Sequence, residues 1–312
     1  MSNPIGQYVN GNHITTIWDN GTRLQETICP DDTVFTFEYP ESFDFKINDR
    51  CSLGCPWCHE NSTPDGIVPS LTDFIETTFY KSIPPYVEMA IGGGNIFESK
   101  DLEILLDENK KRKIISNITV DQYTAVKRFT EIRKLLNHDM IHGLGISITR
   151  QTDDIHDVLS SFGNNVVLHV IAGNFDDSIV GFLSGKKVLV LGYKIFNRGQ
   201  TYWNENQDSI RRNIDWLKSY LPRLKENTIT LSFDCLALDQ LDVRNVLDVK
   251  DEDWNILYQG DDNKTKDDEG NIICSTMYVD LPGMSVARNS TSPRIFSLDL
   301  SSSLRYEFEK TL

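Results

Sequence analysis

Three cysteines that lie close together in the chain are the residues with the clearest potential for chemistry. Cys51, Cys55 and Cys58 occupy the run Cys-Ser-Leu-Gly-Cys-Pro-Trp-Cys, with the spacing C-x3-C-x2-C. Thiolates this close can ligate one iron–sulfur cluster, and a 4Fe–4S cube is usually held by four of them. Three ligands leave one iron open to a small molecule. The motif therefore predicts a metal centre suited to catalysis more than to electron transfer alone.

Other interpretations of this run account for fewer of its residues. The segment from Cys55 to His59 also matches the haem-attachment pattern C-x-x-C-H, which implies an exported protein. Cys55 and Cys58 alone could form a redox pair, but both interpretations leave Cys51 without a role. A zinc site made by the three cysteines and His59 stays open, although adjacent residues are awkward tetrahedral ligands.

The composition narrows the class of protein. The chain has 312 residues, is 39% apolar and 25% charged, and carries a net charge of −15. This charge disfavours binding to intact nucleic acid, which requires Lys and Arg against phosphates. No apolar run approaches the ~20 residues of a membrane span, and we see no secretory signal. We therefore expect a cytoplasmic protein, in which clustered cysteines favour metal or redox chemistry over disulfides.

Alternating strands and helices must position the cysteine loop. Short apolar segments separated by helical periodicity indicate parallel βαβ units, and we predict an α/β fold with a partial (β/α)6 TIM-like barrel. Ligands of such folds bind at the carboxyl ends of the strands. The predicted strands are 43–47, 86–91, 114–120, 145–149, 166–171 and 188–193, and the clearest helices are 125–136 and 209–224.

The two ends of the chain break this repeat. At the N-terminus, residues 11–18, a turn at 19–22 and a strand at 34–37 predict a β-hairpin extension. At the C-terminus, a further strand at 228–233 and short strands at 272–279, 285–287 and 295–298 predict a small α/β cap. We therefore divide the chain into an N-terminal extension (1–40), a barrel core (41–227) and a C-terminal cap (228–312).

The cysteine motif resembles a known signature. A C-x3-C-x-aromatic-C run directly after the first strand of a β/α fold is similar to that of the radical S-adenosylmethionine superfamily, and the resemblance covers about residues 41–195. It implies that Cys51, Cys55 and Cys58 hold an oxygen-sensitive 4Fe–4S cluster whose open iron binds S-adenosylmethionine. Reductive cleavage then releases a 5′-deoxyadenosyl radical, which abstracts a substrate hydrogen. Trp57 takes the aromatic position beside the adenine.

A glycine-rich segment carries a second part of the resemblance. Gly92, Gly93 and Gly94 follow the second predicted strand, where the superfamily often has Gly-Gly-Glu-Pro. The resemblance implies that their backbone carbonyls accept hydrogen bonds from the methionyl ammonium, and glycine permits such a close approach. Asn95 stands where Glu is common, so the resemblance does not imply a carboxylate–ammonium contact; we predict Asn95 as a cofactor-binding residue together with the three glycines. An ordinary tight turn is the alternative interpretation.

Residues of the later predicted strands match the superfamily less clearly, and each of them could equally be an ordinary core residue. The resemblance places Ser147 or Thr149 at the ribose, Arg150 at the carboxylate, Val170 and Ile171 along the adenine ring, and the backbone of Gly192 and Tyr193 at its edge. We expect His169, in mid-strand, to be a core residue.

The substrate is much less visible in the sequence. Cys29, Cys235 and Cys274 are scattered, so we expect no auxiliary cluster. Cys274 is a candidate catalytic hydrogen-atom donor or covalent partner, with a buried apolar role as the alternative.

The run from Cys58 to Gly66, together with the glycine-rich segment, is similar to small superfamily members encoded by phages and related mobile elements. A peptide, nucleotide or small metabolite fits as substrate, and the edge of the N-terminal extension could pair with a peptide strand. The resemblance also implies a reducing partner such as flavodoxin or ferredoxin. A non-catalytic zinc- or iron–sulfur-binding protein is the alternative function.

Overall fold

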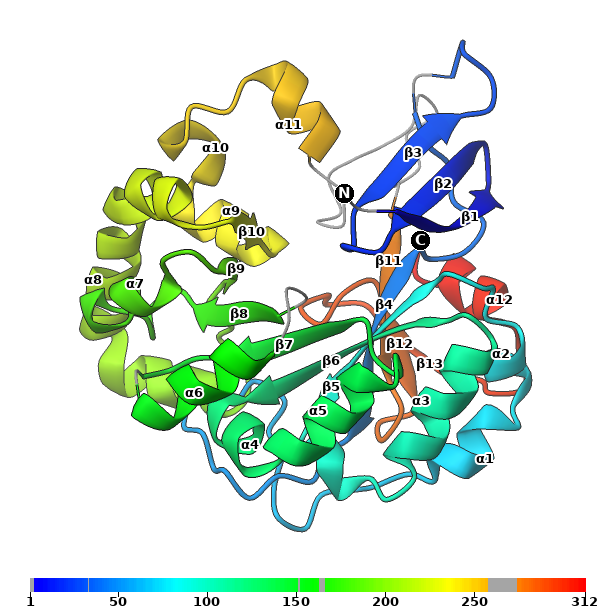
Figure 1. The fold of residues 1–312 in the computed structure, drawn as a ribbon, viewed down its shortest axis with the longest axis horizontal. Helices are drawn as coiled ribbons and strands as arrows, with labels where there is room; N and C mark the ends of the chain where they lie inside the picture. Colours follow the sequence, from blue (N-terminus) through cyan, green and yellow to red (C-terminus); the bar gives the residue numbers. More distant parts are fainter. Residues whose placement is uncertain (1–2, 33, 151, 163–165, 258–273) are drawn as a thin grey trace.

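One ten-stranded sheet organises the structure, a computed structural model that describes residues 3–32, 34–150, 152–162, 166–257 and 274–312 (Figure 1). Its strands follow the order β10-β9-β8-β7-β6-β5-β4-β11-β12-β13. The strands are β4 (Ser42–Asn48), β5 (Glu88–Gly93), β6 (Ile115–Asp121), β7 (Gly143–Ser147), β8 (Val166–Ile171), β9 (Lys187–Leu191), β10 (Thr230–Phe233), β11 (Thr276–Asp280), β12 (Ser285–Ala287) and β13 (Ile295–Ser297).

The sheet is mostly parallel, which confirms the predicted α/β class. Every neighbouring pair from β10 to β11 is parallel, and only the pairs β11–β12 and β12–β13 are antiparallel. The six predicted barrel strands correspond to β4–β9. Among the described strands, β10 and β13 lie at the two edges of the sheet and do not pair with each other, so the barrel is open. Because β10 extends the parallel run and β11 returns to pair with β4, the segment predicted as a cap adds strands to both sides of the core; the domain boundaries themselves stay predictions.

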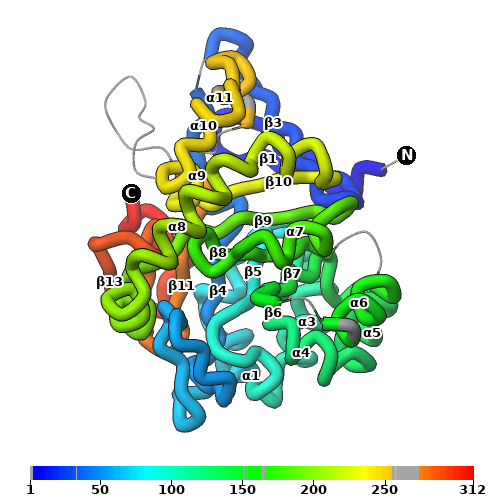
Figure 2. The backbone as a smooth tube through the Cα atoms, turned by 90° about the vertical axis from the view of Figure 1, so that its left-hand side faces the viewer, coloured from blue at the N-terminus to red at the C-terminus, as the bar shows by residue number. Residues whose placement is uncertain are grey.

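Helices cover one face of this sheet, as the two perpendicular views show (Figures 1 and 2). The predicted helix 125–136 is divided into α4 and α5 at Arg128, and the predicted helix 209–224 lies within α8, which bends at Asn206. The helices are α1 (Leu71–Ile75), α2 (Thr78–Lys81), α3 (Leu102–Lys111), α4 (Gln122–Lys127), α5 (Phe129–Asn137), α6 (Asp153–Ser161), α7 (Asp177–Leu183), α8 (Arg198–Asn227), α9 (Cys235–Leu241), α10 (Val243–Val246), α11 (Asp251–Leu257) and α12 (Leu304–Glu309), with a 3₁₀ turn η1 (Ile96–Glu98). No helix in the described ranges has both the length and the apolar character needed to cross a membrane.

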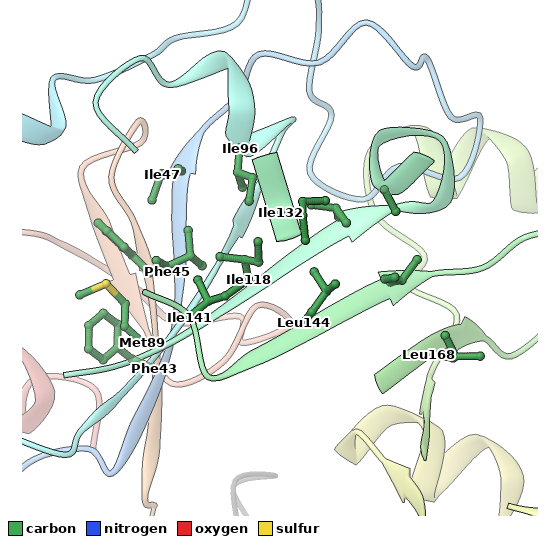
Figure 3. Close-up of a cluster of buried hydrophobic side chains, with 14 of the residues drawn as sticks. Phe43, Phe45, Ile47, Met89, Ile96, Ile118, Ile132, Ile141, Leu144 and Leu168 are labelled. Atoms are coloured by element: carbon green, nitrogen blue, oxygen red, sulfur yellow. The ribbon is translucent and has the colours of Figure 1, made fainter. Parts of the chain in front are cut away.

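Strand alternation gives the sheet two different faces. On β4, Phe43, Phe45 and Ile47 are buried in the apolar core beneath the helices, to which β5–β9 contribute Met89, Ile118, Leu144, Leu168 and others (Figure 3). Burial of each such side chain contributes about 1.5–3 kcal/mol. Successive side chains point to opposite faces, so Asp44 and Lys46 of the same strand lie on the other face, which we call the inner face.

A separate three-stranded antiparallel sheet caps the amino ends of β4 and β5. It consists of β1 (Pro4–Asn10), β2 (His13–Trp18) and β3 (Arg23–Thr27). The predicted strand at 11–18 and turn at 19–22 correspond to β2 and the turn after it, whereas β1 and β3 were not predicted. Arg23 bridges to Glu88 at the start of β5, with an Nη2–Oε2 distance of 2.9 Å. The prediction of a strand at 34–37 is wrong, because these residues form no strand. The Thr36 N–H donates a hydrogen bond to the side chain of Asn12 rather than to a neighbouring strand.

Candidate functional site

The cysteine loop leaves the carboxyl end of β4 and is closed by backbone hydrogen bonds. The Cys51 N–H donates to the Thr63 carbonyl at 2.9 Å, and the Thr63 N–H donates to the Asp49 carbonyl at 3.0 Å. Within the loop, the Cys58 N–H donates to the Cys55 carbonyl at 3.2 Å. These bonds hold the three cysteines, all partly buried, on one short segment at the strand end.

The thiols lie close enough to influence one another electrostatically. Burial raises the pKa of the Cys55 thiol, and the neighbouring Cys58 and Cys51 raise it further. Burial also raises the pKa of Cys51, with Asp121 and Cys58 adding to the effect. A bound cation would reverse this effect, since metal binding stabilises the thiolate.

The donors match an iron–sulfur cluster in chemical type, since three thiols share one loop beside a cavity. In the described part of the chain, no three His, Cys, Asp or Glu side chains already form a metal-holding group.

The glycine-rich segment packs directly against this loop. The Gly94 N–H donates to the Asn48 carbonyl at 2.8 Å, and the Asn95 N–H donates to the Arg50 carbonyl at 2.7 Å. Gly93 has a φ of 115°, and a Cβ there would lie 2.6 Å from the Asn48 oxygen. A Cβ at Gly94 would lie 2.3 Å from the Arg50 oxygen. Both glycines are therefore needed for chain packing.

Gly92 and Asn95 have different roles in the same segment. A Cβ at Gly92 would meet no atom within 4 Å, so this residue leaves open space on the inner face. Asn95 precedes η1, and its side chain accepts the Phe97 N–H at 3.1 Å. Of the four residues predicted here, Gly92 and Gly93 line a cavity, whereas Gly94 and Asn95 join the segment to the loop.

Two neighbouring cavities lie beside the cysteine loop. The small cavity has a volume of about 30 Å³. Four predicted residues from three segments line it, namely Trp57, Ile171, Gly192 and Tyr193. The large cavity has a volume of about 140 Å³ and includes Gly92 and Gly93. His59 and Lys194 line both cavities.

The direction of each side chain along its strand, and the hydrogen bonds already made by the backbone, show which of the predicted adenine contacts are open. Val170 is fully buried in the core beneath the helices, whereas Ile171 faces the small cavity. Tyr193 exchanges both of its backbone hydrogen bonds with the Gln240 side chain, and the Gly192 N–H donates to Asp234. The two backbone N–H groups and the Tyr193 carbonyl are therefore already paired within the chain, which leaves the Gly192 carbonyl for the predicted contact with adenine.

Four other predicted residues lie outside both cavities. Ser147 ends β7 without lining either one, and Thr149 and Arg150 are exposed, with their N–H groups donating to Gln122. Cys274 is 1% exposed and precedes β11, whose first residue pairs with Ser42 at the amino end of β4. Cys274 is thus at the opposite end of the strands from the cysteine loop, and its position matches the buried apolar alternative.

A charged cluster on the inner face was not predicted. The Lys46 ammonium lies 2.6 Å from Asp49, 3.1 Å from Glu60 and 3.2 Å from Asp280. Glu60 also contacts His59 at 3.0 Å and accepts the Tyr278 hydroxyl at 3.0 Å. The alternation Phe-Asp-Phe-Lys-Ile in β4 was a signal for charged residues on this face, but it did not reveal their partners.

This cluster has well-defined charges at neutral pH. Burial disfavours the charged form of Lys46, but Glu60 and the two aspartates outweigh it and raise its pKa. Burial likewise opposes ionisation of Glu60, but His59 and Lys46 lower its pKa. Burial and the nearby Lys194 lower the pKa of His59.

Comparisons with known proteins do not identify a family. No protein-family model matches the sequence, and no similar protein is found among those with curated descriptions. Among solved structures, the chain is similar to native anSMEcpe with bound AdoMet and the Cp18Cys peptide, with a TM-score of 0.49 and 11% sequence identity. The match covers 81% of this chain and 74% of that chain. A similarity of this size carries no argument about ligand or activity.

Proposed function

We propose that the chain is a radical S-adenosylmethionine enzyme that abstracts a hydrogen atom from a small substrate. The observation that supports this most is the direct bonding of two motifs far apart in sequence. The cysteine loop and the glycine-rich segment are joined backbone to backbone through Asn48 and Arg50, beside both cavities. Ligands of parallel α/β sheets bind at this end of the strands.

The residues around the loop have separate roles in this proposal. Cys51, Cys55 and Cys58 would hold a 4Fe–4S cluster, which when bound supplies the electron that cleaves S-adenosylmethionine to the 5′-deoxyadenosyl radical. Trp57 and Ile171 provide an apolar wall for the adenine in the small cavity. The backbone carbonyls of Gly92 and Gly93 would accept hydrogen bonds from the methionyl ammonium, as the resemblance implies.

Lys46 is a positioning residue for the cysteine loop. Asp49 lies before the first cysteine and Glu60 after the last, and both carboxylates contact the Lys46 ammonium. The lysine thereby holds the two ends of the loop against β4. Asp280, at the end of β11, adds a third contact from a distant part of the chain. The loop is therefore anchored to two neighbouring strands.

Production of 5′-deoxyadenosine tests the proposal. The protein would be reconstituted anaerobically with iron and sulfide, reduced with dithionite and given S-adenosylmethionine. We expect slow formation that disappears in Cys55→Ala, together with loss of iron. Cys29→Ala is the matched control, because this exposed thiol lies outside the loop and its removal should change neither quantity.

The same experiment distinguishes the proposed enzyme from the alternative, a non-catalytic metal-binding protein. Colourless protein that binds one zinc and no cluster would refute the proposal and favour a structural metal site. Full iron retention in any of Cys51→Ala, Cys55→Ala or Cys58→Ala would refute that residue as a ligand.

A further inference from the structure

Two oppositely charged side chains in the large cavity have no role in the proposed chemistry. Asp44, from the middle of β4, and Lys194, after β9, both line it. Asp44 forms no hydrogen bond or ion pair with any described residue. Within the same described ranges, the Lys194 ammonium contacts no carboxylate; its partners are Nε2 of His59 at 3.3 Å and Oγ of Ser290 at 2.8 Å. Asp44 is exposed in this cavity and Lys194 is partly exposed, so both charges are open to a ligand.

The other charges of the cavity are already matched. Lys46 is surrounded by three carboxylates, and Glu60 has Lys46, His59 and Tyr278 as partners. Tyr278 neighbours Asp44 across the β4–β11 pair, but its hydroxyl donates to Glu60 instead. None of these groups is therefore available to neutralise Asp44.

The surroundings of Asp44 favour a cationic ligand group. The protein atoms around Asp44 partly desolvate its carboxyl and raise its pKa to about 6; Lys194 lowers the pKa, whereas Glu88, Glu60 and Asp234 raise it. Near neutral pH this carboxyl is mostly ionised, in a region with more carboxylates than ammonium groups. Lys194 and Asp44 attract each other without forming an ion pair, so a molecule with both charges can lie between them.

The volume of the cavity limits the size of that molecule. One water needs about 10–15 Å³ in the same measure, so a cavity of about 140 Å³ has room for about ten water-sized atoms. This is the size of a small amino acid.

From these observations we propose that the substrate is a free amino acid, with its ammonium on Asp44 and its carboxylate on Lys194. This inference deepens the proposed function by naming the substrate class of the same site.

Direct binding to the full chain tests the inference without turnover. Each proteinogenic amino acid would be titrated into the anaerobic, cluster-loaded protein, with the N-acetyl and amide derivatives of any binder as matched compounds. We expect at least one amino acid to bind, and each derivative to bind at least about tenfold more weakly, since each lacks one charge. Asp44→Asn and Lys194→Met should each weaken binding by about tenfold or more. Asp157→Asn and Lys225→Met, exposed on α6 and α8, should remain within about twofold.

A pH series gives a second readout. Affinity in the parent protein should fall as the pH is lowered through about 6, because protonation of Asp44 removes the ion pair. Affinity in Asp44→Asn should lack this step. A circular dichroism spectrum equal to that of the parent would establish that the variant is folded.

Three results would overturn the inference. They are no binding by any amino acid, unchanged affinity in both variants, or loss of S-adenosylmethionine affinity alone, which would assign the two charges to the cofactor. Failure of the proposed function gives a different pattern, in which amino-acid binding is normal but no 5′-deoxyadenosine forms.

Discussion

Replacing Lys46 by methionine tests how the cysteine loop is held. Methionine preserves the length of the aliphatic chain and removes only the ammonium group. Three carboxylates would then face one another on the inner face without their common partner, at positions now 2.6–3.2 Å from the Lys46 nitrogen. Glu60 would keep only His59 and Tyr278.

The burial of the four groups sets the size of the effect. Removing one partner of a buried ion pair costs about 3–5 kcal/mol. The Lys46 side chain is 8% exposed, but its partners are 15–27% exposed, so solvent screens part of the repulsion. We therefore expect a loss of about 2–3 kcal/mol in the free energy of unfolding at neutral pH.

Urea unfolding of the metal-free protein near pH 8 and pH 3 measures this loss. Glu60 has a lowered pKa in the folded parent protein, so its stabilising contribution is fully present above the unfolded value of 4.5 and is lost as the pH falls below it. Protonation also relieves the repulsion in the variant. The difference between the two proteins should therefore shrink toward pH 3.

Lys111→Met is the control, because Lys111 also contacts two carboxylates but is 63% exposed; its change should be much smaller. A loss below about 1 kcal/mol for Lys46→Met, or one independent of pH, would refute the reasoning.

Further predictions concern the cavity walls. Gly93→Ala should destabilise the fold by about 2 kcal/mol or more in urea unfolding, because its φ of 115° and the nearby Asn48 oxygen disfavour a Cβ. Gly92→Ala should leave stability within about 1 kcal/mol but weaken S-adenosylmethionine binding severalfold by calorimetry; equal effects of the two changes would contradict this division. Tyr278→Phe should cost about 1 kcal/mol through its lost hydrogen bond, and no measurable loss would argue against that bond. The raised pKa of Asp44 means that stability falls as the pH rises through about 6, so Asp44→Asn should stabilise the protein near pH 8 by up to about 1 kcal/mol after solvent screening, and not near pH 4. A stabilisation independent of pH would contradict that assignment.

Local patterns were enough to locate the main strands. The predicted strand 166–171 coincides with β8, and the other five barrel strands are displaced by no more than about two residues at either end, which is usual for strand boundaries. Apolar runs and alternation report which face a residue occupies, and this depends on neighbours along the chain. Val34–Phe37 has the same local pattern but no partner strand, so its composition predicted a strand wrongly.

The choice between adjacent residues required the structure. Val170 and Ile171 are both apolar, so their types do not distinguish them. Only the orientation of β8 relative to the helices shows that Val170 points into the core and Ile171 toward the small cavity. Cys274 could not be excluded from the site by its type, but its position before β11 places it at the amino end of β4.

The sequence by itself determined that three thiols share a loop after a strand of an α/β fold, and that charged residues alternate with phenylalanines on that strand. Spacing and periodicity are local properties of the chain, so they can be recognised without knowledge of the fold. Only the tertiary structure decided which charges meet. Lys46 and Asp280 are 234 residues apart, and the insertion of β11 beside β4 brings them together. The order of strands in a sheet arises from packing between distant segments, which no local pattern encodes.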